Sequence, residues 1–574
     1  MSDVLRVGNC SGFYGDRLTA MREMLEGGEL DVLTGDYLAE LTMLILGRDR
    51  MKDPSLGYAR TFLRQAEECL GLALDRGVKI VANAGGLNPA GLAAKLRALA
   101  DTLGVEPVVA HVEGDDLMDR VAKLGLGEPL TANAYLGAFG IAAALERGAD
   151  IVVTGRVTDA SVVVGPAIAH FGWGRTDYDA LAGAVLAGHV IECGTQACGG
   201  NFSGFRDLHL DATPIGFPLA EISADGGSLI TKHPGTGGAV TVDTVTAQLV
   251  YEVQSTVYLG PDVSAHLDTL TLTPDGDDRV RISGVRGEAP PTQLKVCVNE
   301  LGGFRNSIEF VLTGLDIDAK AGWVRDQMDH ALAKRPASVE WVLAPTARED
   351  AATEEAASSR LRCVVKDPDP DVVGRAFTAP AIELALASYP GFHVTAPPSA
   401  GAPYGIYRAA YVDHADVTHT VVLADGTSLP IAPPPQVQRV EVVETKDENE
   451  TPVDEVPPDV VTRRLPLGTF VHARSGDKGG DANIGLWVDR RSKGEERAAW
   501  LNHFVTAQRI RELIPEAEGL DVEVYRLPNL GAVNVLIRGL LGQGVAASSR
   551  FDPQGKALGE WLRSRHVSIT EDVL

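Results

Sequence analysis

Residues 78–91 read VKIVANAGGLNPAG, an apolar run that ends in a glycine turn and continues into a helical pattern. The β-branched run from Val78 to Asn83 predicts a strand. Pro89 fits the first position of a helix with Asn88 as its N-cap, and we expect this helix to continue to Leu103. The stretch therefore predicts a buried strand, a polar glycine turn and a helix, in that order.

The same unit appears at other places in the first part of the chain. Strand-like runs ending at Gly8 (LRVG), Gly35 (LDVLTG) and Gly155 (DIVVTG) each lead into a polar or glycine-rich turn. Alternating helices and apolar strands are typical of βαβ crossovers. We therefore predict an α/β domain over residues 1–245, with a Rossmann-like, mostly parallel sheet and helices on both of its faces.

Polar residues follow the ends of these predicted strands. In open parallel sheets, ligands bind outside the carboxyl ends of the strands. We therefore expect polar residues that lie far apart in the sequence to converge on one edge of the sheet. The candidates for substrate binding are Ser11, Gly12, Asp36, Asn83, Asn88, Arg156 and Thr158, and Asp159 is a catalytic candidate. Helix capping is the alternative role for Asp36, Asn88, Thr158 and Asp159.

A second glycine-rich stretch, Gly188 to Phe205 (GHVIECGTQACGGNFSGF), follows an apolar helical run. Glycines at this density weaken helices and strands but let a backbone approach a ligand closely, so we interpret the stretch as a site loop. Its catalytic candidates are Glu192, as a general base, and Cys198, as a nucleophile or acid/base. The glycine N–H groups after the cysteine are a candidate oxyanion hole, and the substrate-binding candidates are Gly199, Gly200 and Asn201. A buried turn with inert cysteines is the alternative.

The character of the sequence changes after this loop. Residues 228–238 read SLITKHPGTGG, which predicts a strand, then Lys232 and His233, then a glycine turn whose N–H groups favour anions. Both side chains are substrate-binding candidates, and Arg156 or Lys232 is the expected partner of a carboxylate or phosphate. Residues 246–440 combine alternating Val, Thr and Tyr runs with later helical patterns, which predicts an α+β subdomain.

The last part of the chain begins with an acidic, proline-containing stretch, residues 441–461, which its composition indicates is a linker. Residues 462–574 alternate strands and helices in an order that favours a split βαβ, ferredoxin-like α+β domain. Its loop from Ala473 to Asn483 reads ARSGDKGGDAN. We expect this loop to complete the pocket at the main domain or across a subunit interface, with the substrate-binding candidates Asp477, Lys478 and Asn483. A self-contained surface turn is the alternative.

The composition indicates an ordinary globular protein of several domains. The 574 residues exceed what one hydrophobic core usually serves. The net charge of −26 argues against nucleic acid or an anionic membrane as the main partner. The six scattered cysteines form neither a disulfide framework nor a zinc pattern. The start of the sequence has no secretory signal and no apolar run of about 18 residues appears, so we expect a cytoplasmic protein.

Several motifs of the chain resemble one known family. They are GNCSGFYGDR, LTGDYLAELTM, NAGGLNPAG, TGRVTDAS, ECGTQACGGNFSGF and KHPGTGG. With these motifs the large region resembles the acyclic terpene utilisation family AtuA, and ARSGDKGGDANIGL looks like the ferredoxin-like domain that is often fused behind it. The resemblance covers nearly the whole chain. It implies a part in the breakdown of branched acyclic terpenoids and related acids as CoA thioesters, and it implies no particular reaction.

Two functions fit these observations. The first is a catabolic enzyme that acts on a branched acyl-CoA or a related carboxylate, as a lyase, hydratase, hydrolase or acyl transferase. The second is a non-catalytic binding or assembly component of an acyl-CoA pathway complex. For the second, the C-terminal apolar residues Leu530, Val533, Leu536, Leu540 and Leu541 form either a subunit interface or simply a core.

The expected ligands follow from the first function. The partner is a small-molecule substrate, a CoA thioester, and CoA enters as part of that substrate. Mg²⁺ is an alternative that no diagnostic spacing supports, with Asp36, Asp159, Asp477 and Asp481 as possible oxygen ligands. We also expect a homo-oligomer, because the chain is large and carries a tethered small domain.

Overall fold

The computed structural model describes residues 3–208, 212–439 and 461–574. Its internal contacts divide the chain into two units. The first unit consists of the residues up to Asn299, Tyr407–Val545 and Gln554–Leu574, and the second of Glu300–Ile406 and Ala546–Pro553. The four-part division that we expected from the sequence stays a prediction. Its acidic linker, residues 441–461, lies outside the described residues except for Val461.

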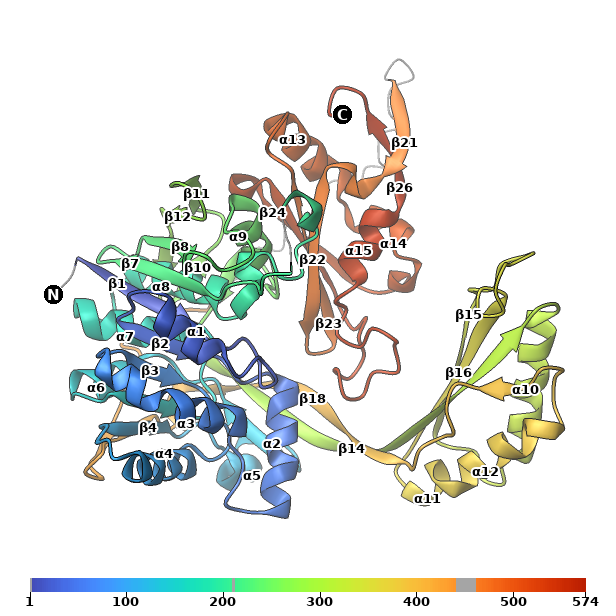
Figure 1. The fold of residues 1–574 in the computed structure, drawn as a ribbon, viewed down its shortest axis with the longest axis horizontal. Coiled ribbons are helices and arrows are strands. Elements are labelled where there is room, and N and C mark those ends of the chain that lie inside the picture. The colour runs from blue at the N-terminus through green and yellow to red at the C-terminus, as the bar shows by residue number, and fades with distance from the viewer. Residues whose placement is uncertain (1–2, 209–211, 440–460) are drawn as a thin grey trace. The chain divides into compact units, whose positions relative to one another are not determined.

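The first unit is built on an 11-stranded sheet in the order β11-β12-β8-β7-β1-β2-β3-β6-β4-β19-β20 (Figure 1). Its centre is parallel and consists of β1 (Val4–Asn9), β2 (Val32–Gly35), β3 (Lys79–Ala82), β6 (Ile151–Thr154) and β4 (Val109–Glu113). The flanking strands are antiparallel: β7 (Pro218–Ser223), β8 (Ser228–Lys232), β11 (Thr271–Pro274), β12 (Val280–Ser283), β19 (Thr420–Val422) and β20 (Ser428–Pro430). The predicted α/β class is confirmed, in a mixed sheet with a parallel core.

Helices cover both faces of the parallel core. In β6, Ile151 and Val153 belong to one hydrophobic cluster and Val152 to another, because successive side chains of a strand point to opposite faces. The cluster on one face includes α1 (Ala20–Gly27), α3 (Arg60–Asp75) and α4 (Pro89–Leu103), and the cluster on the other includes α6 (Phe139–Glu146), α7 (Ser161–Phe171) and α8 (Tyr178–Ile191). The predicted helix start is confirmed, since the Gly91 N–H donates to Asn88 Oδ1 at 2.9 Å.

Shorter elements of the first unit surround the sheet. A three-stranded antiparallel sheet joins β9 (Val257–Leu259), β10 (Ser264–His266) and β13 (Arg286–Glu288). The long strand β14 (Gln293–Thr313) pairs near its start with β5 (Thr131–Ala134). The remaining helices of this part are α2 (Glu40–Lys52), α5 (Val121–Leu124) and α9 (Val242–Leu249).

The C-terminal domain, also in the first unit, has a four-stranded antiparallel sheet in the order β22-β23-β25-β24. Its elements are β22 (Val471–Lys478), β23 (Asp481–Val488), α13 (Gly494–Phe504), α14 (Ala507–Leu513), β24 (Val522–Leu527), β25 (Ala532–Ile537) and α15 (Leu558–Ser564), with β21 (Thr462–Pro466) paired to β26 (His566–Thr570). The sheet contains the split βαβ unit that we expected, because α13 and α14 connect β23 to β24 and β25 lies between these two strands, antiparallel to both. The ferredoxin-like α+β class predicted for this domain is confirmed.

The apolar residues that we considered for a subunit interface are buried in this domain. Leu530, Val533, Leu536, Leu540 and Leu541 are all at most 8% exposed. Val533, Leu540 and Leu541 belong to the domain's own hydrophobic cluster. They therefore serve as core residues, and the alternative of an exposed apolar face is wrong.

The second unit has its own sheet and core. The later part of β14 pairs with β16 (Ser358–Asp367) and β17 (His393–Val394), β16 pairs with β15 (Ser338–Ala344), and β18 (Ala402–Asp413) pairs with β14. Helices α10 (Ile317–Ala331), α11 (Pro370–Val373) and α12 (Arg375–Glu383) supply apolar side chains to the cluster on this sheet.

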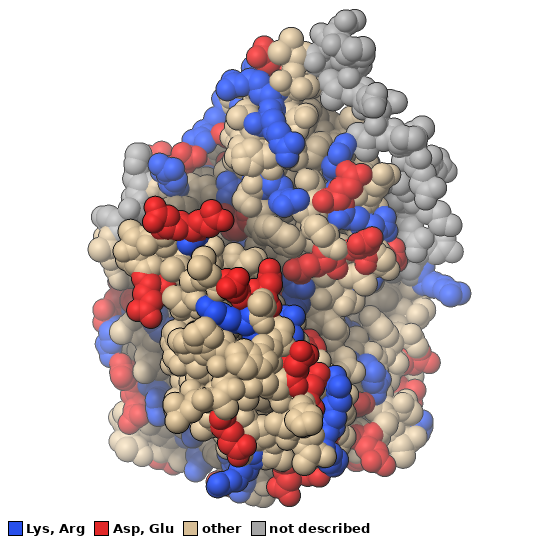
Figure 2. All heavy atoms as spheres, turned by 90° about the vertical axis from the view of Figure 1, so that its right-hand side faces the viewer, with Lys and Arg blue, Asp and Glu red and all other residues tan. Residues whose placement is uncertain are grey.

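Charged side chains are mixed on the face that Figure 2 shows, where Lys and Arg are interspersed with Asp and Glu. This face therefore has no extended field of one sign, although the chain carries a net charge of −26. None of the helices in the described ranges is long and apolar enough to cross a membrane.

Candidate functional site

A cavity of about 880 Å³ lies in the first unit, at the carboxyl ends of the central parallel strands. Three strands, β1, β2 and β6, deliver residues to its wall, as the topology of a parallel sheet predicts. The segment that follows the end of α8 and strand β22 of the C-terminal domain contribute other residues to the wall. The predicted site residues that line the cavity are Gly12, Asp36, Arg156, Thr158, Asp159, Glu192, Asn201, Asp477 and Lys478.

Two other predicted residues, Asn83 and Ser11, contact this wall from behind, whereas Asn88 does not. Asn83 is fully buried, donates from Nδ2 to Asp36 Oδ1 at 2.5 Å and accepts from the Tyr37 N–H at 2.7 Å. The Ser11 N–H donates to Asn9 Oδ1 at 2.7 Å, inside the turn after β1. Asn88 caps α4 and donates to the Ser55 carbonyl, so its role is the capping alternative.

Cys198 and its glycines lie away from the cavity wall. Cys198 ends a short 3₁₀ helix (Gly194–Cys198), is fully buried in an apolar cluster, and has a pKa raised by that burial. The Gly199 N–H donates to the Gln196 carbonyl at 3.1 Å and the Gly200 N–H to the Thr195 carbonyl at 3.0 Å. Because both N–H groups are already bonded, the structure forms no oxyanion hole from them.

Lys232 and His233 line a separate pocket of about 460 Å³. Lys232 Nζ lies 3.1 Å from Asp278 Oδ2 and donates to the Thr236 carbonyl at 2.9 Å. His233 Nε2 lies 3.0 Å from the Met24 carbonyl oxygen. The structure therefore does not bring these two residues to the cavity.

A buried guanidinium organises the carboxyl groups of the cavity. Arg156 is 2% exposed, and its Nη1 donates to Asp159 Oδ1 at 2.9 Å and to the Leu38 carbonyl at 3.0 Å. Its Cζ lies 4.3 Å from the centre of the Tyr135 ring, a cation–π contact. Burial raises the pKa of Asp36 well above its ordinary value, with a further contribution from Asp159. Burial and the neighbouring Asp159 thus disfavour the ionised form of Asp36.

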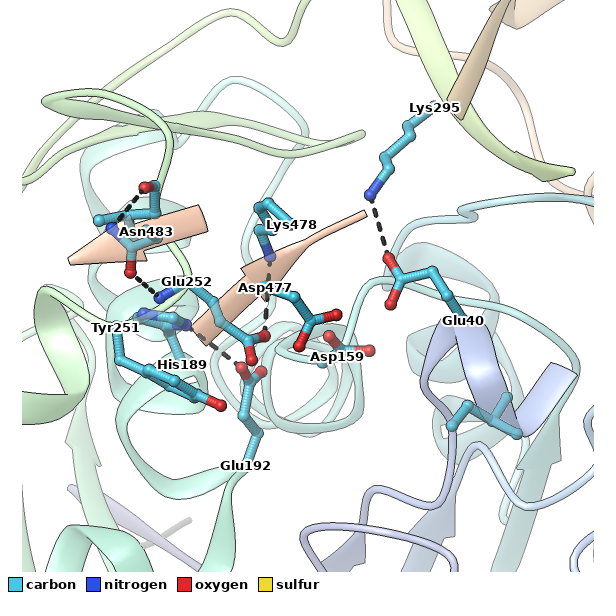
Figure 3. A network of polar contacts seen from close by, with 12 residues as sticks. Glu40, Asp159, His189, Glu192, Tyr251, Glu252, Lys295, Asp477, Lys478 and Asn483 are labelled. Carbon is cyan, nitrogen blue, oxygen red and sulfur yellow. Dashed lines mark hydrogen bonds and ion pairs between the residues drawn. The ribbon is translucent and has the colours of Figure 1, made fainter. Parts of the chain in front are cut away.

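Glu192 extends into the cavity from the end of α8 (Figure 3). Burial, with the negative charge of Asp159, raises its pKa well above the ordinary value. Its Oε1 lies 3.2 Å from His189 Nδ1, and burial lowers the pKa of His189 to about 4, so this ring is neutral at pH 7. Within the described residues, Glu192 Oε2 has no hydrogen-bond partner. Glu192 is thus a carboxyl group that keeps its proton and has one oxygen available to a ligand.

The C-terminal domain supplies Asp477, Lys478 and Lys556 to a charged cluster around Glu252 in the same cavity, where Figure 3 shows Asp477 and Lys478 beside Glu252. Glu252 Oε1 lies 3.2 Å from Lys556 Nζ, and its Oε2 lies 4.0 Å from Lys478 Nζ. Burial raises the pKa of Glu252, but Lys556 and Lys478 outweigh that effect and the pKa is below its ordinary value. Burial and Glu252 raise the pKa of Asp477 to about 7.

A further ion pair lies at another part of the wall. Lys295 Nζ is 3.3 Å from Glu40 Oε1, and the Tyr135 hydroxyl donates to the same oxygen at 3.0 Å. Burial raises the pKa of Glu40, but Lys295 and Arg156 lower it by more, so Glu40 is ionised. Figure 3 shows this pair apart from Glu192 and Glu252, so the cavity has charged groups at two places.

Comparison with known protein families shows which family the chain belongs to. The model of the acyclic terpene utilisation family protein AtuA matches residues 5–423. This chain is a member of the AtuA family. A second model, the AtuA ferredoxin-like domain, matches residues 465–568. Both predicted resemblances are therefore confirmed, and they link this AtuA protein to acyclic terpene utilisation without defining a reaction. No curated protein matches the chain.

Several cavity residues of this AtuA protein had no assignment from the sequence, namely Glu40, Tyr135, Tyr251, Glu252, Lys295 and Lys556. Glu40 belongs to the LTGDYLAELTM motif, which was a usable signal. Glu252 and Lys295 stand in strand-rich sequence with no local motif. In the part of the chain that the structure describes, no group of three or more His, Cys, Asp and Glu side chains is arranged to hold a metal ion.

Proposed function

We propose that this AtuA protein is a catabolic enzyme that acts by acid–base chemistry on a branched acyl-CoA or a related carboxylate, as a lyase or hydratase. The observation that carries the proposal is one cavity in which two buried carboxyl groups with raised pKa values, Glu192 and Asp36, lie beside the buried guanidinium of Arg156. Carboxyl groups of different protonation state in one site are the usual arrangement for proton transfer to and from a substrate.

The size and lining of the cavity support a thioester substrate. Ligand pockets usually have volumes of about 300–1,000 Å³, and this cavity, at about 880 Å³, is near the upper end. Arg156 Nε has no hydrogen-bond partner in the described ranges although the residue is buried. We infer that Arg156, with Lys478, orients an anionic or carbonyl oxygen of the substrate.

Covalent catalysis by a cysteine receives no support from the site. A reactive cysteine needs a lowered pKa, and burial raises the pKa of all six cysteines. Acyl transfer or hydrolysis through Cys198 would also require the thiol to reach the cavity wall, which it does not line. Proton transfer by carboxyl groups is therefore the chemistry that we favour. We propose that this chemistry takes place in the cytoplasm.

Hydrogen exchange at the α-carbon of a thioester tests the proposal. We would incubate the protein in D₂O with isovaleryl-CoA, whose α-carbon can be deprotonated directly, and with 3-methylcrotonyl-CoA, whose α-carbon takes up deuterium through reversible addition of water, and follow the uptake by mass spectrometry. The wild-type protein is expected to exchange the proton, and Glu192→Gln to lose about 10²-fold or more of the rate, because general acid–base groups contribute about 10²–10⁴-fold. Cys198→Ala is the matched control and should retain the rate. The absence of exchange with both thioesters would contradict the proposal.

A further inference from the structure

Glu252 has a backbone conformation that non-glycine residues rarely adopt. Its φ is 56°, in the left-handed region, where an L side chain is strained. Such conformations persist only where the surrounding structure fixes them, and they are frequent at functional sites. Glu252 lines the cavity, so the conformation aims a carboxylate at a place where chemistry is expected.

The contacts that fix this conformation come from the C-terminal domain. The Glu252 N–H donates to Asn483 Oδ1 at 2.7 Å. The next carbonyl, that of Val253, accepts from Asn483 Nδ2 at 3.1 Å and from Asn534 Nδ2 at 3.0 Å. Both asparagines are fully buried, in the middle of β23 and β25. The backbone N–H of Glu252 and the carbonyl of the following residue, Val253, are therefore both held by buried side chains of one sheet.

Glycines in the same sheet allow this contact. A Cβ atom on Gly485 would lie 2.3 Å from Val250 Cγ2, and one on Gly476 would lie 2.6 Å from Tyr251 Cε2. Glycine weakens a strand interior, so its use at these places follows from the close approach of residues 250–253. The ARSGDKGGDANIG motif thus supplies both the clearance for this segment and the amide that holds it.

The Glu252 carboxylate faces Glu192 in Figure 3, and the electrostatic effect of Glu252 on Glu192 agrees with their closeness. The two groups have opposite environments. Glu192 is buried beside Asp159 and keeps its proton, whereas Glu252 lies beside Lys478 and Lys556 and is ionised. Two carboxyl groups whose environments differ in this way commonly act as the acid and the base of one reaction.

We propose that Glu252 is the catalytic base of the site, acting opposite Glu192, and that Asn483 of the C-terminal domain is the residue that positions it. The inference rests on the proposed function. In the step, a Glu252 oxygen takes the α-proton of the thioester as the C–H bond breaks. The electron pair moves into the carbonyl, whose oxygen accepts a hydrogen bond from protonated Glu192. Return of a hydron from the carboxyl group of Glu252 restores the substrate.

The test of Glu252 uses deuterium uptake by isovaleryl-CoA in D₂O. Glu252→Gln is expected to lower the rate by about 10²-fold or more. Glu252→Gly removes the carboxylate and the left-handed strain together, so it should abolish exchange while the melting temperature stays at or above that of the wild type. Added acetate should restore part of the exchange in Glu252→Gly, because it supplies the missing base. Lys493→Gly, at an exposed left-handed residue with φ 50°, is the matched control for strain and should retain exchange.

The test of Asn483 is a double-mutant cycle. Asn483→Ala should lower the exchange rate in the wild type and cause little further loss in Glu252→Gln, because a positioning residue acts only through the group that it positions. Asn502→Ala, in α13 of the same domain, is the control and should leave exchange unchanged. Equal losses from Asn483→Ala in both backgrounds would give Asn483 a general structural role and overturn the positioning claim.

The outcomes of these experiments distinguish a wrong assignment of the base from a wrong proposed function. If the wild type exchanges and Glu252→Gln keeps the rate, the base assignment is overturned while the proposed function stands. If Glu252→Gly loses as much melting temperature as Asn483→Ala and acetate restores nothing, Glu252 is a structural ion-pair residue. If the wild type exchanges neither isovaleryl-CoA nor 3-methylcrotonyl-CoA, the proposed function fails and the base assignment with it.

Discussion

Replacing Gly485 with alanine is expected to force apart the C-terminal sheet and the segment that carries Glu252. The added Cβ atom would lie 2.3 Å from Val250 Cγ2 and 2.6 Å from the Val250 carbonyl oxygen. A backbone oxygen cannot rotate away as the end of a side chain can, so one chain must move. Overpacking of this kind costs about 1–3 kcal/mol. Alanine also lowers the conformational entropy of the unfolded chain relative to glycine, which stabilises the folded protein by about 0.4–1 kcal/mol. The difference spans about 0–2.6 kcal/mol, and because one of the contacts is with backbone we expect a net loss in the upper part of that range, about 1–2.6 kcal/mol.

Thermal unfolding and deuterium exchange measure this change together. A loss of 1 kcal/mol lowers the melting temperature by about 2–4 °C in a unit of about 150–250 residues, and by less in a larger one. Exchange with isovaleryl-CoA should fall as well, because Glu252 moves with the segment. Gly494→Ala is the matched control, since its Cβ would meet nothing closer than 3.4 Å and alanine favours the helix that begins there. Wild-type melting and exchange in Gly485→Ala would show that this close contact neither limits the packing nor positions Glu252.

Other predictions concern the buried charges and the thiols. Arg156→Met should lower the free energy of unfolding measured in urea. Breaking a fully buried ion pair costs about 3–5 kcal/mol, and the loss here should be smaller because the partner, Asp159, is 25% exposed. An unchanged free energy of unfolding would contradict the role of this ion pair. Burial raises the pKa of Asp115 from 3.8 to about 7, so its contribution to stability is greatest below pH 3.8 and is lost as the pH rises to about 7. Asp115→Asn should therefore weaken the fall in stability over that range, and an unchanged pH dependence would count against it. Cys193 is half-buried and the other five cysteines are buried, so iodoacetamide should label Cys193 first. The labelling should be slow because burial raises the pKa of the Cys193 thiol, and isovaleryl-CoA should protect this cavity residue from it. Peptide mass spectrometry would measure both effects.

The parallel core was predictable because its signals are local. The run at residues 78–83 and the Asn88–Pro89 helix start both depend on neighbouring residues alone, and the structure has them as β3 and α4. The convergence of Asp36, Arg156 and Asp159 also follows from topology, since the carboxyl ends of parallel strands share an edge. Sequence reasoning therefore found the part of the cavity that the parallel sheet builds.

The glycine-rich stretches correctly indicated where the backbone is in close contact, but they did not indicate whether the contact is with a ligand or with the protein itself. A Cβ on Gly12 would lie 2.6 Å from the Cys193 backbone, one on Gly199 would lie 2.6 Å from Leu208 Cδ1, and one on Gly238 would lie 2.2 Å from the Cys198 carbonyl oxygen. At these glycines, other segments of the same chain pack directly against the backbone. The loop around Cys198 is therefore packed, although its glycines alone equally suggested a ligand.

Glu252 and Lys295 were not predictable from local patterns. Lys295 reaches Glu40 only because β14 pairs with β5, and this pairing joins residues that are far apart in the sequence. Glu252 reaches the cavity through a left-handed conformation that Asn483 holds from the C-terminal domain. Asn483 itself was a candidate, but its role in holding a peptide segment depends on a contact between distant segments that the motif does not encode.

Thermal unfolding of the full-length protein with isovaleryl-CoA, free CoA and isovalerate tests whether the cavity binds a branched acyl-CoA. A ligand at about 100 times its dissociation constant adds about 2.7 kcal/mol of stability. The cavity described here predicts a rise in melting temperature with the thioester, and a much smaller rise in Arg156→Met. A rise that Arg156→Met leaves unchanged, or no rise with isovaleryl-CoA, would contradict the claim that this cavity binds a branched acyl-CoA.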